Sequence, residues 1–120
     1  MKIELGSLPD PQLNPNKRHH PMRLARTKKV ARKVAWALAL EAGVPRTPLS
    51  KAHITITFVA KDRIRRDLDN LVASMKAYID GIVDAGVIED DSATNVSYSF
   101  SYERGEKANT IVKIDALGRP

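Results

Sequence analysis

The stretch RRDLDNLVASMKAYIDGIVDAG, residues 65–86, decides the fold of this chain. Its apolar residues recur every three or four positions, which is the spacing of one face of an α-helix. These residues are Leu68, Leu71, Val72, Met75, Ile79, Ile82 and Val83. Gly86 follows them as a helix-stopping residue, so we expect an amphipathic helix from Leu68 to about Val83 with its apolar face against a core.

Segments on both sides of this helix alternate in polarity and predict strands. Residues 51–60 alternate Ile and Phe with Thr, and residues 96–102 alternate Val, Tyr and Phe with Ser. A turn around Gly105 should join the second segment to residues 110–116 as a hairpin partner. Residues 1–5 complete the set as a short strand.

A second helix is expected earlier in the chain, from Met22 or Arg23 to Ala42, with Gly43 as its C-terminal stop. Its candidate apolar face consists of Val30, Val34, Ala37 and Leu38. The order β–α–β–α–β–β predicts an α+β fold: a small mixed sheet of about four strands with two helices packed on one face.

Length and composition limit the class of protein. A chain of 120 residues forms one domain, residues 1–120, in which the proline-rich residues 6–21 are expected to be a flexible basic loop that packs poorly. The absence of cysteine excludes disulfides and cysteine-based zinc sites. The N-terminus has no apolar signal core and no stretch is long enough to span a bilayer, so we expect a soluble cytoplasmic protein with no membrane partner.

Positive charge is concentrated in the first half of the chain. The net charge is +6, and residues 17–33 contain eight Lys or Arg and no acid. Such a run is either a solvated helix face or a nucleic-acid contact strip, and acidic residues elsewhere in the chain favour the second interpretation. The candidate contacts are Lys17, Arg18, Lys28, Lys29, Arg32, Lys33, Arg65 and Arg66.

Acids form two groups, Asp67 with Asp69 and Asp90 with Asp91. Grouped carboxylates repel one another unless a cation lies among them, and oxygen ligands suit Mg²⁺, with Mn²⁺ as a substitute. The alternative is structural: Asp67 is a good N-cap, and Asp-Asp-Ser is an ordinary turn. Adjacent residues on an extended segment point to opposite sides, so only one of Asp90 and Asp91 should face a metal.

Lys76 and Asp80 share the polar face of the expected helix with Asp69. At about 100° per residue, Lys76 lies roughly 20° from Asp69 around the helix axis. A lysine there can pair with a ligand carboxylate, contact a phosphate or orient a water molecule. The alternative is a surface ion pair between Lys76 and Asp80 at four-residue spacing.

The motifs RDLDNL at 66–71, DGIVDAG at 80–86 and EDDS at 89–92 resemble the RusA family of Holliday-junction resolvases. The resemblance covers residues 65 to about 96, and the preceding segments are similar in order and length. It implies a small, homodimeric, Mg²⁺-dependent endonuclease that cleaves four-way DNA junctions in a bacterial or phage-infected cell. It also implies that Asp67, Asp69 and Asp91 are metal ligands, with Asp91 preferred to Asp90.

One departure from the family concerns the catalytic lysine. The best-known members place it four residues after the second Asp of the motif, where this chain has Ala73. Here Lys76, four residues before Asp80, is expected to take that role. The predicted catalytic set is therefore Asp67, Asp69, Asp91 and Lys76.

Two other functions remain open from the sequence. One is a nucleic-acid-binding protein without catalysis, and the other is a metal-dependent flap or single-strand nuclease. The histidines are assigned no metal: His19 and His20 are expected to be either DNA-proximal or disordered, and His53 is expected to be structural.

Overall fold

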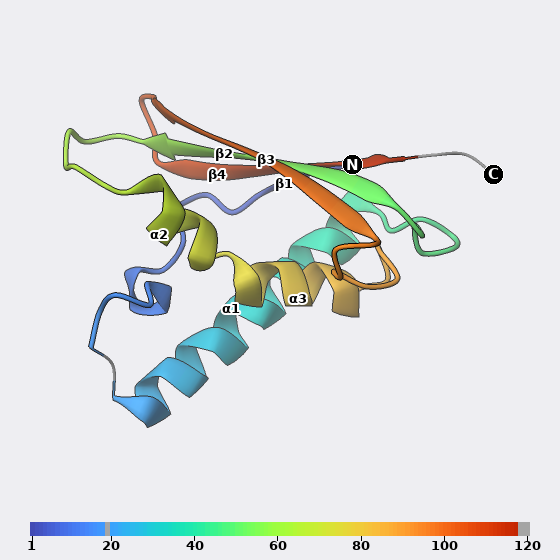
Figure 1. Cartoon of the computed structure of the whole chain (residues 1–120), viewed down its shortest axis with the longest axis horizontal. Helices are drawn as coiled ribbons and strands as arrows, with labels where there is room; N and C mark the ends of the chain where they lie inside the picture. The colour runs from blue at the N-terminus through green and yellow to red at the C-terminus, as the bar shows by residue number, and fades with distance from the viewer. Residues whose placement is uncertain (19, 118–120) are drawn as a thin grey trace.

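The computed structural model describes residues 1–18 and 20–117 and forms an α+β fold (Figure 1). A single mixed sheet contains β1 (Lys2–Glu4), β2 (Ala52–Ala60), β3 (Val96–Arg104) and β4 (Asn109–Ala116). The helices are α1 (Pro21–Ala42), α2 (Leu68–Ala73) and α3 (Lys76–Asp84). All three helices lie on the same face of the sheet in Figure 1, so the predicted architecture is confirmed.

The strand order is β1-β4-β2-β3. Strands β2 and β3 are parallel, whereas β4 pairs antiparallel with both β1 and β2. The predicted hairpin between residues 96–102 and 110–116 is therefore wrong, because β2 lies between them. Strand β4 buries Val112 and Ile114 and suits the interior of the sheet, whereas β3 exposes its serines and suits an edge. Gly105 lets the connection cross the end of β2, because a Cβ there would lie 2.7 Å from Val59 Cγ1.

The core lies between the sheet and the helices. Ile54, Ile56 and Phe58 of β2 are fully buried, as their alternation predicts. Met75 and Ile79 belong to the same buried cluster, so the apolar stripe of residues 68–83 does face the core. Burial of these side chains supplies most of the favourable free energy of folding.

None of the helices of the described residues lies on the opposite face of the sheet (Figure 1). Strands β2 and β3 place small polar residues on that face, namely Thr55, Thr57, Ser97, Ser99 and Ser101. His53 lies on this face, and its Nδ1 and Nε2 are 2.7 Å and 2.9 Å from the hydroxyl oxygens of Ser97 and Ser99. Both ring nitrogens are thus used in cross-strand hydrogen bonds, which fits the structural role expected for His53.

The buried face of α1 differs from the one expected except at Leu38, which packs against the core. Val30 and Val34 are 57% and 40% exposed, and the buried residues are Ala31, Ala35 and Ala39. The cause is the close approach of α3, where a Cβ on Gly81 would lie 2.1 Å from the carbonyl oxygen of Arg32. Only small side chains fit between helices at that separation, so alanine takes the place of valine in the interface.

The single helix expected from Leu68 to Val83 is interrupted after Ala73. Ser74 and Met75 have ψ angles of −9° and −11°, and the Ser74 hydroxyl donates to the carbonyl oxygen of Asn70 at 2.8 Å. Such back-bonding by serine bends or breaks helices. Lys76 therefore begins a new helix, and the helical phase that was expected to place it near Asp69 does not apply.

The expected loop at residues 6–21 packs better than its prolines suggest. A short 3₁₀ turn, Pro11–Leu13, buries Leu13, and the backbone N–H of Asp10 donates to the Tyr78 hydroxyl at 3.1 Å. The prediction of poor packing is therefore wrong for residues 10–13, whereas residues 15–18 are exposed. His20 caps α1, its Nδ1 accepting from Met22 N at 3.2 Å, and the prediction for His19 lies outside the described residues.

No helix in the described part of the chain is long and apolar enough to cross a membrane.

Candidate functional site

The structure brings Lys76, Asp80 and Asp91 together. The ammonium group of Lys76 donates to Asp80 Oδ1 at 2.9 Å and to Asp91 Oδ2 at 2.5 Å. Asp80 lies one turn along α3, and Asp91 comes from the segment between α3 and β3. Lys76 thus makes the ion pair that was the alternative explanation and also contacts one of the predicted ligand carboxylates, Asp91 rather than Asp69.

The charges of this cluster stabilise one another. The hydrogen bond from Lys76 lowers the pKa of Asp91 below its ordinary value. The hydrogen bonds to Asp91 and then to Asp80 raise the pKa of Lys76. Both partners are therefore ionised at neutral pH, and Lys76 can act there as a fixed positive charge but not as a proton acceptor.

Asp67 and Asp69 have different surroundings. Asp67 precedes α2 at the N-cap position, but its side chain makes no capping hydrogen bond and lies 3.3 Å from Arg65 Nη2. Asp69 accepts a hydrogen bond from the backbone N–H of Asn70 at 3.0 Å. Neither is paired with Lys76, so the four predicted catalytic residues form one pair, Lys76 with Asp91, and two separate carboxylates.

Asp90 and Asp91 have different hydrogen-bond partners. Asp91 is directed to Lys76, whereas Asp90 Oδ1 accepts a hydrogen bond from the backbone N–H of Asp91 at 2.9 Å. This difference favours Asp91 as the functional member of the pair.

The donor chemistry of these acids suits a hard divalent cation, but the described residues do not assemble a complete site. Within residues 1–18 and 20–117, no group of three His, Asp or Glu side chains lies close enough to hold a metal ion. The Asp67 side chain is 51% exposed and the Asp91 side chain 22% exposed, so Asp67 is the freer of the two to rotate. The metal site stays a prediction.

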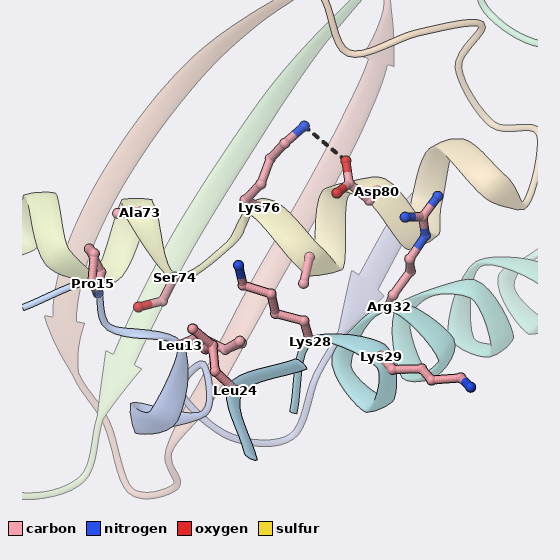
Figure 2. A pocket seen from close by; sticks show the side chains of 11 residues that line it. Leu13, Pro15, Leu24, Lys28, Lys29, Arg32, Ala73, Ser74, Lys76 and Asp80 are labelled. Atoms are coloured by element: carbon pink, nitrogen blue, oxygen red, sulfur yellow. Dashed lines mark hydrogen bonds and ion pairs between the residues drawn. The ribbon is translucent and has the colours of Figure 1, made fainter. Parts of the chain in front are cut away.

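A groove of about 500 Å³ borders the cluster, between the N-terminal half of α1 and the α2–α3 junction. Leu13, Leu24 and Ala77 supply apolar lining. Figure 2 shows Lys28 extending across the groove toward the α2–α3 segment, with the tip of Lys29 pointing away. The remaining lining residues include Arg32, Ala73, Ser74, Lys76 and Asp80. Cationic side chains thus surround the rim on which Asp80 lies.

The predicted DNA contacts divide into paired and unpaired cations. Arg32 is bidentate with Asp84, with Nη2 2.8 Å from Oδ1. Arg66 is bidentate with Asp62 at 2.7 Å and 3.0 Å and also donates to the Tyr102 hydroxyl. These two arginines hold structural elements together, and their charge is largely compensated locally.

The other cations are exposed, and Arg65 makes only the 3.3 Å contact to Asp67. Five of the predicted contacts have no carboxylate within 4 Å among the described residues. They are Lys17, Arg18, Lys28, Lys29 and Lys33. Their charge is available to a polyanion.

A second groove, of about 460 Å³, lies on the other side of the α2–α3 junction. Lys17, Arg65 and Asp67 line it, and Ser74 lines both grooves. Asn70 lies between Asp67 and the loop, accepting a hydrogen bond from Asn16 Nδ2 at 3.0 Å. The predicted ligands are therefore distributed around one junction rather than in one cavity.

Sequence reasoning missed Tyr98 as a neighbour of the site. Tyr98, Lys76 and Asp91 line a third groove, and burial, followed by the negative charge of Asp91, raises the pKa of Tyr98. The alternation of aromatic residues with serine on β3 is the sequence signal for it, because alternation indicates which aromatic side chains share one face of the strand. The Arg32–Asp84 pair was also missed, and no local pattern links residues on separate helices.

Comparison with known proteins leaves the function to be argued from these residues. Models of known protein families give no match to this chain. An uncharacterized protein of Xylella fastidiosa is similar, with 36% identity over 85 residues that cover 68% of this chain and 56% of that protein. The chain thus spans just over half the length of this relative.

Proposed function

We propose that this protein is a Mg²⁺-dependent endonuclease of the RusA type that resolves branched DNA, Holliday junctions in particular, by paired nicking. The observation that carries the proposal is the Lys76–Asp80–Asp91 cluster on the rim of a groove lined by Lys28, Lys29 and Arg32. Basic side chains attract and orient a phosphodiester backbone, and the acids lie where that backbone would pass.

Each residue has a distinct part in this proposal. Lys28 and Lys29 bind backbone phosphates, and Lys76 holds Asp91 ionised while offering positive charge to a phosphate oxygen. Asp91, with Asp69 and Asp67, would hold the divalent ion after rotation of the exposed Asp67 and Asp69 side chains. That ion would supply an activated water and charge stabilisation at the phosphate.

Paired nicking needs two equivalent sites. A homodimer with two-fold symmetry would present the same groove to two strands of a four-way junction related by the same symmetry. We therefore include a homodimer in the proposal, and we place the protein in the cytoplasm, where DNA is available.

The test is cleavage of a synthetic four-way junction with and without Mg²⁺. We expect paired nicks only with Mg²⁺ or Mn²⁺, and we expect Asp69→Asn to abolish nicking while leaving junction affinity unchanged or tighter. Loss of one negative charge weakens metal binding but also reduces repulsion of phosphates.

Asp91→Asn and Asp90→Asn form a matched pair, because the residues are adjacent and the substitution is the same. Of these two variants only Asp91→Asn should abolish cleavage, since Asp91 contacts Lys76 and Asp90 does not. Equal rates for wild type and Asp91→Asn at limiting Mg²⁺ would refute the assignment. Comparison with flap and single-stranded DNA at equal concentration would separate junction cleavage from another nuclease activity.

The second candidate is a DNA-binding protein without catalysis. The ion pairs of Lys76 with Asp80 and Asp91, and of Arg65 with Asp67, favour it because they give these acids a structural partner. Salt-dependent junction binding with no nicking in Mg²⁺ or Mn²⁺ would support this candidate over the nuclease.

A further inference from the structure

A third groove, of about 300 Å³, runs between the edge strand β3 and the helices α2 and α3. Its lining is mostly apolar, from Ile56, Val72, Ala73, Met75 and Ile79, and it has two charged residues, Lys76 and Asp91. Tyr98 and Phe100 of β3 complete it. The groove therefore combines an apolar interior with the charged cluster of the candidate site.

The two aromatic rings in this groove form a platform. Tyr98 and Phe100 stack with ring centroids 5.5 Å apart and an interplanar angle of 10°. Tyr98 is 37% exposed, in contrast to Phe58 of the core, which is fully buried. Among the described residues, β3 is the last strand of the sheet, and no further strand pairs with its outer edge. An exposed, flat aromatic pair is a surface on which another planar ring can stack.

The charges around the groove indicate which planar ring would bind there. Lys76 and Ala73 also line the basic groove that contains Lys28 and Lys29, so both grooves border the α2–α3 junction. A ligand that joins a flat apolar ring to a phosphate would match both: the ring would enter the apolar groove and the phosphate would face lysine. A nucleotide has this chemistry, and bases that leave the duplex are held between aromatic and apolar side chains.

We infer that the groove between β3 and α3 binds an unpaired nucleobase of the DNA, stacked on Tyr98, with the adjoining phosphate beside Lys76. The inference rests on the proposed function and adds to it a site for one unstacked base next to the acids. A base pair beside a branch point lacks continuous stacking on one side, so a base there leaves the helix at a lower cost than one inside a duplex. This site would therefore contribute to selection of branched DNA over continuous duplex.

The experiment measures binding without divalent metal, so that no cleavage occurs. Fluorescence anisotropy compares a duplex containing one unpaired adenine, the same duplex with an abasic residue at that position, and the fully paired duplex. Wild type should bind the unpaired adenine most tightly and the other two equally. Stacking of one base contributes about 1–3 kcal/mol, so the preference should be roughly 5- to 150-fold.

Tyr98→Leu should remove this preference and leave affinity for paired duplex unchanged. Tyr102→Leu is the control, because Tyr102 lies on the same face of β3 with the same 37% exposure but outside the groove. It also removes the hydrogen bond from Arg66 to the Tyr102 hydroxyl, so Tyr102→Phe is compared with it to measure that loss separately. Tyr98→Phe should keep the preference. The abasic comparison uses the unaltered protein, so it decides the question even if Tyr98→Leu does not fold.

Two results would overturn the inference. One is a wild-type preference that persists with the abasic residue, and the other is an unchanged preference in Tyr98→Leu. If Tyr98→Leu with unchanged preference also converts a dimer to a monomer, a second copy of the chain covers the groove instead. Each of these would leave Mg²⁺-dependent nicking intact, whereas wild type that binds no DNA in any arm would overturn the proposed function as well.

Discussion

Substitution of Gly81 by alanine tests the packing of α1 against α3. Alanine is the better helix former by about 1 kcal/mol, so helix propensity alone predicts a more stable protein. The structure predicts the opposite, because the new Cβ would lie 2.1 Å from Arg32 O and 3.0 Å from Ala35 Cβ. The first atom belongs to the backbone and cannot rotate away.

The magnitude follows from the movement that alanine would require. Ordinary van der Waals contact begins at 3.4 Å, so the helices must separate by about 1 Å. A gap of that size loses a quarter to a half of the attraction of each contact across the interface. Overpacking of this kind costs about 3 kcal/mol, and the gain in propensity offsets about 1 kcal/mol. We expect Gly81→Ala to lower the free energy of unfolding by about 2 kcal/mol, which is roughly 8 °C in Tm.

Urea denaturation at pH 7, followed by circular dichroism, measures this change. The midpoint should fall with little change in slope, since the folded and unfolded states keep similar exposed areas. Ala37→Gly, at an exposed position of α1, is the control and should cost about 1 kcal/mol through propensity alone. A Gly81→Ala protein as stable as wild type, or more stable, would refute the packing argument.

Two further predictions concern charge. Lys76→Ala should slow single-turnover cleavage roughly 10²-fold, or about 2.7 kcal/mol, and raise the pKa of Asp91 measured by NMR, because the hydrogen bond that lowers it is lost. Because the pKa of Asp91 is depressed in the folded state, its carboxylate stabilises the fold above the ordinary Asp pKa, and this stabilisation is lost as the pH falls through the folded-state pKa. The free energy of unfolding should therefore depend less on acid pH in Lys76→Ala than in wild type. An Asp91 pKa that is the same in both proteins would contradict the contact. Replacing Lys28, Lys29 and Lys33 with glutamine should lower the log–log salt slope of DNA binding by about 0.9 per lost phosphate contact, and an unchanged slope would assign them to solvent.

The fold was predictable where local patterns and tertiary packing agree. Ile54, Ile56 and Phe58 alternate as a half-buried strand and are buried as expected, and α1 stops at Gly43, whose φ of 94° suits glycine. Hydrophobic periodicity identifies which residues turn inward along one element. It does not identify which element lies beside it.

The predictions are wrong where the packing of an element depends on a neighbouring element. The buried face of α1 is set by Gly81 on another helix, so Val30, although more hydrophobic than Ala31, remains exposed. Strand β4 follows β3 after a short connection but pairs with β2, because the interior position suits its buried Val112. Proximity in sequence favours a hairpin of β3 with β4, whereas burial of the β4 side chains favours a position in the interior of the sheet.

The candidate site was predictable in its members but only partly in its arrangement. Helical phase predicted Lys76 near Asp69, and the four-residue spacing predicted the pair with Asp80. The pair of Lys76 with Asp80 is present because both residues lie within α3. The expected proximity of Lys76 to Asp69 is not found, because the break at Ser74 separates these two residues. A sequence pattern gives the phase only along an uninterrupted helix.

The α2–α3 junction connects the parts of the site. Ser74 bonds to the carbonyl of Asn70, while the Asn70 side chain accepts from Asn16 of the N-terminal loop. The same junction ends α2, begins α3 at Lys76, and borders the grooves on both of its sides. An unbroken helix would keep Lys76 on the side of Asp69. Lys76 instead contacts Asp91 from the first position of α3, directly after the interruption. The paired charges that support the proposed function thus lie beside an irregularity of the backbone to which the Ser74 hydroxyl contributes one hydrogen bond.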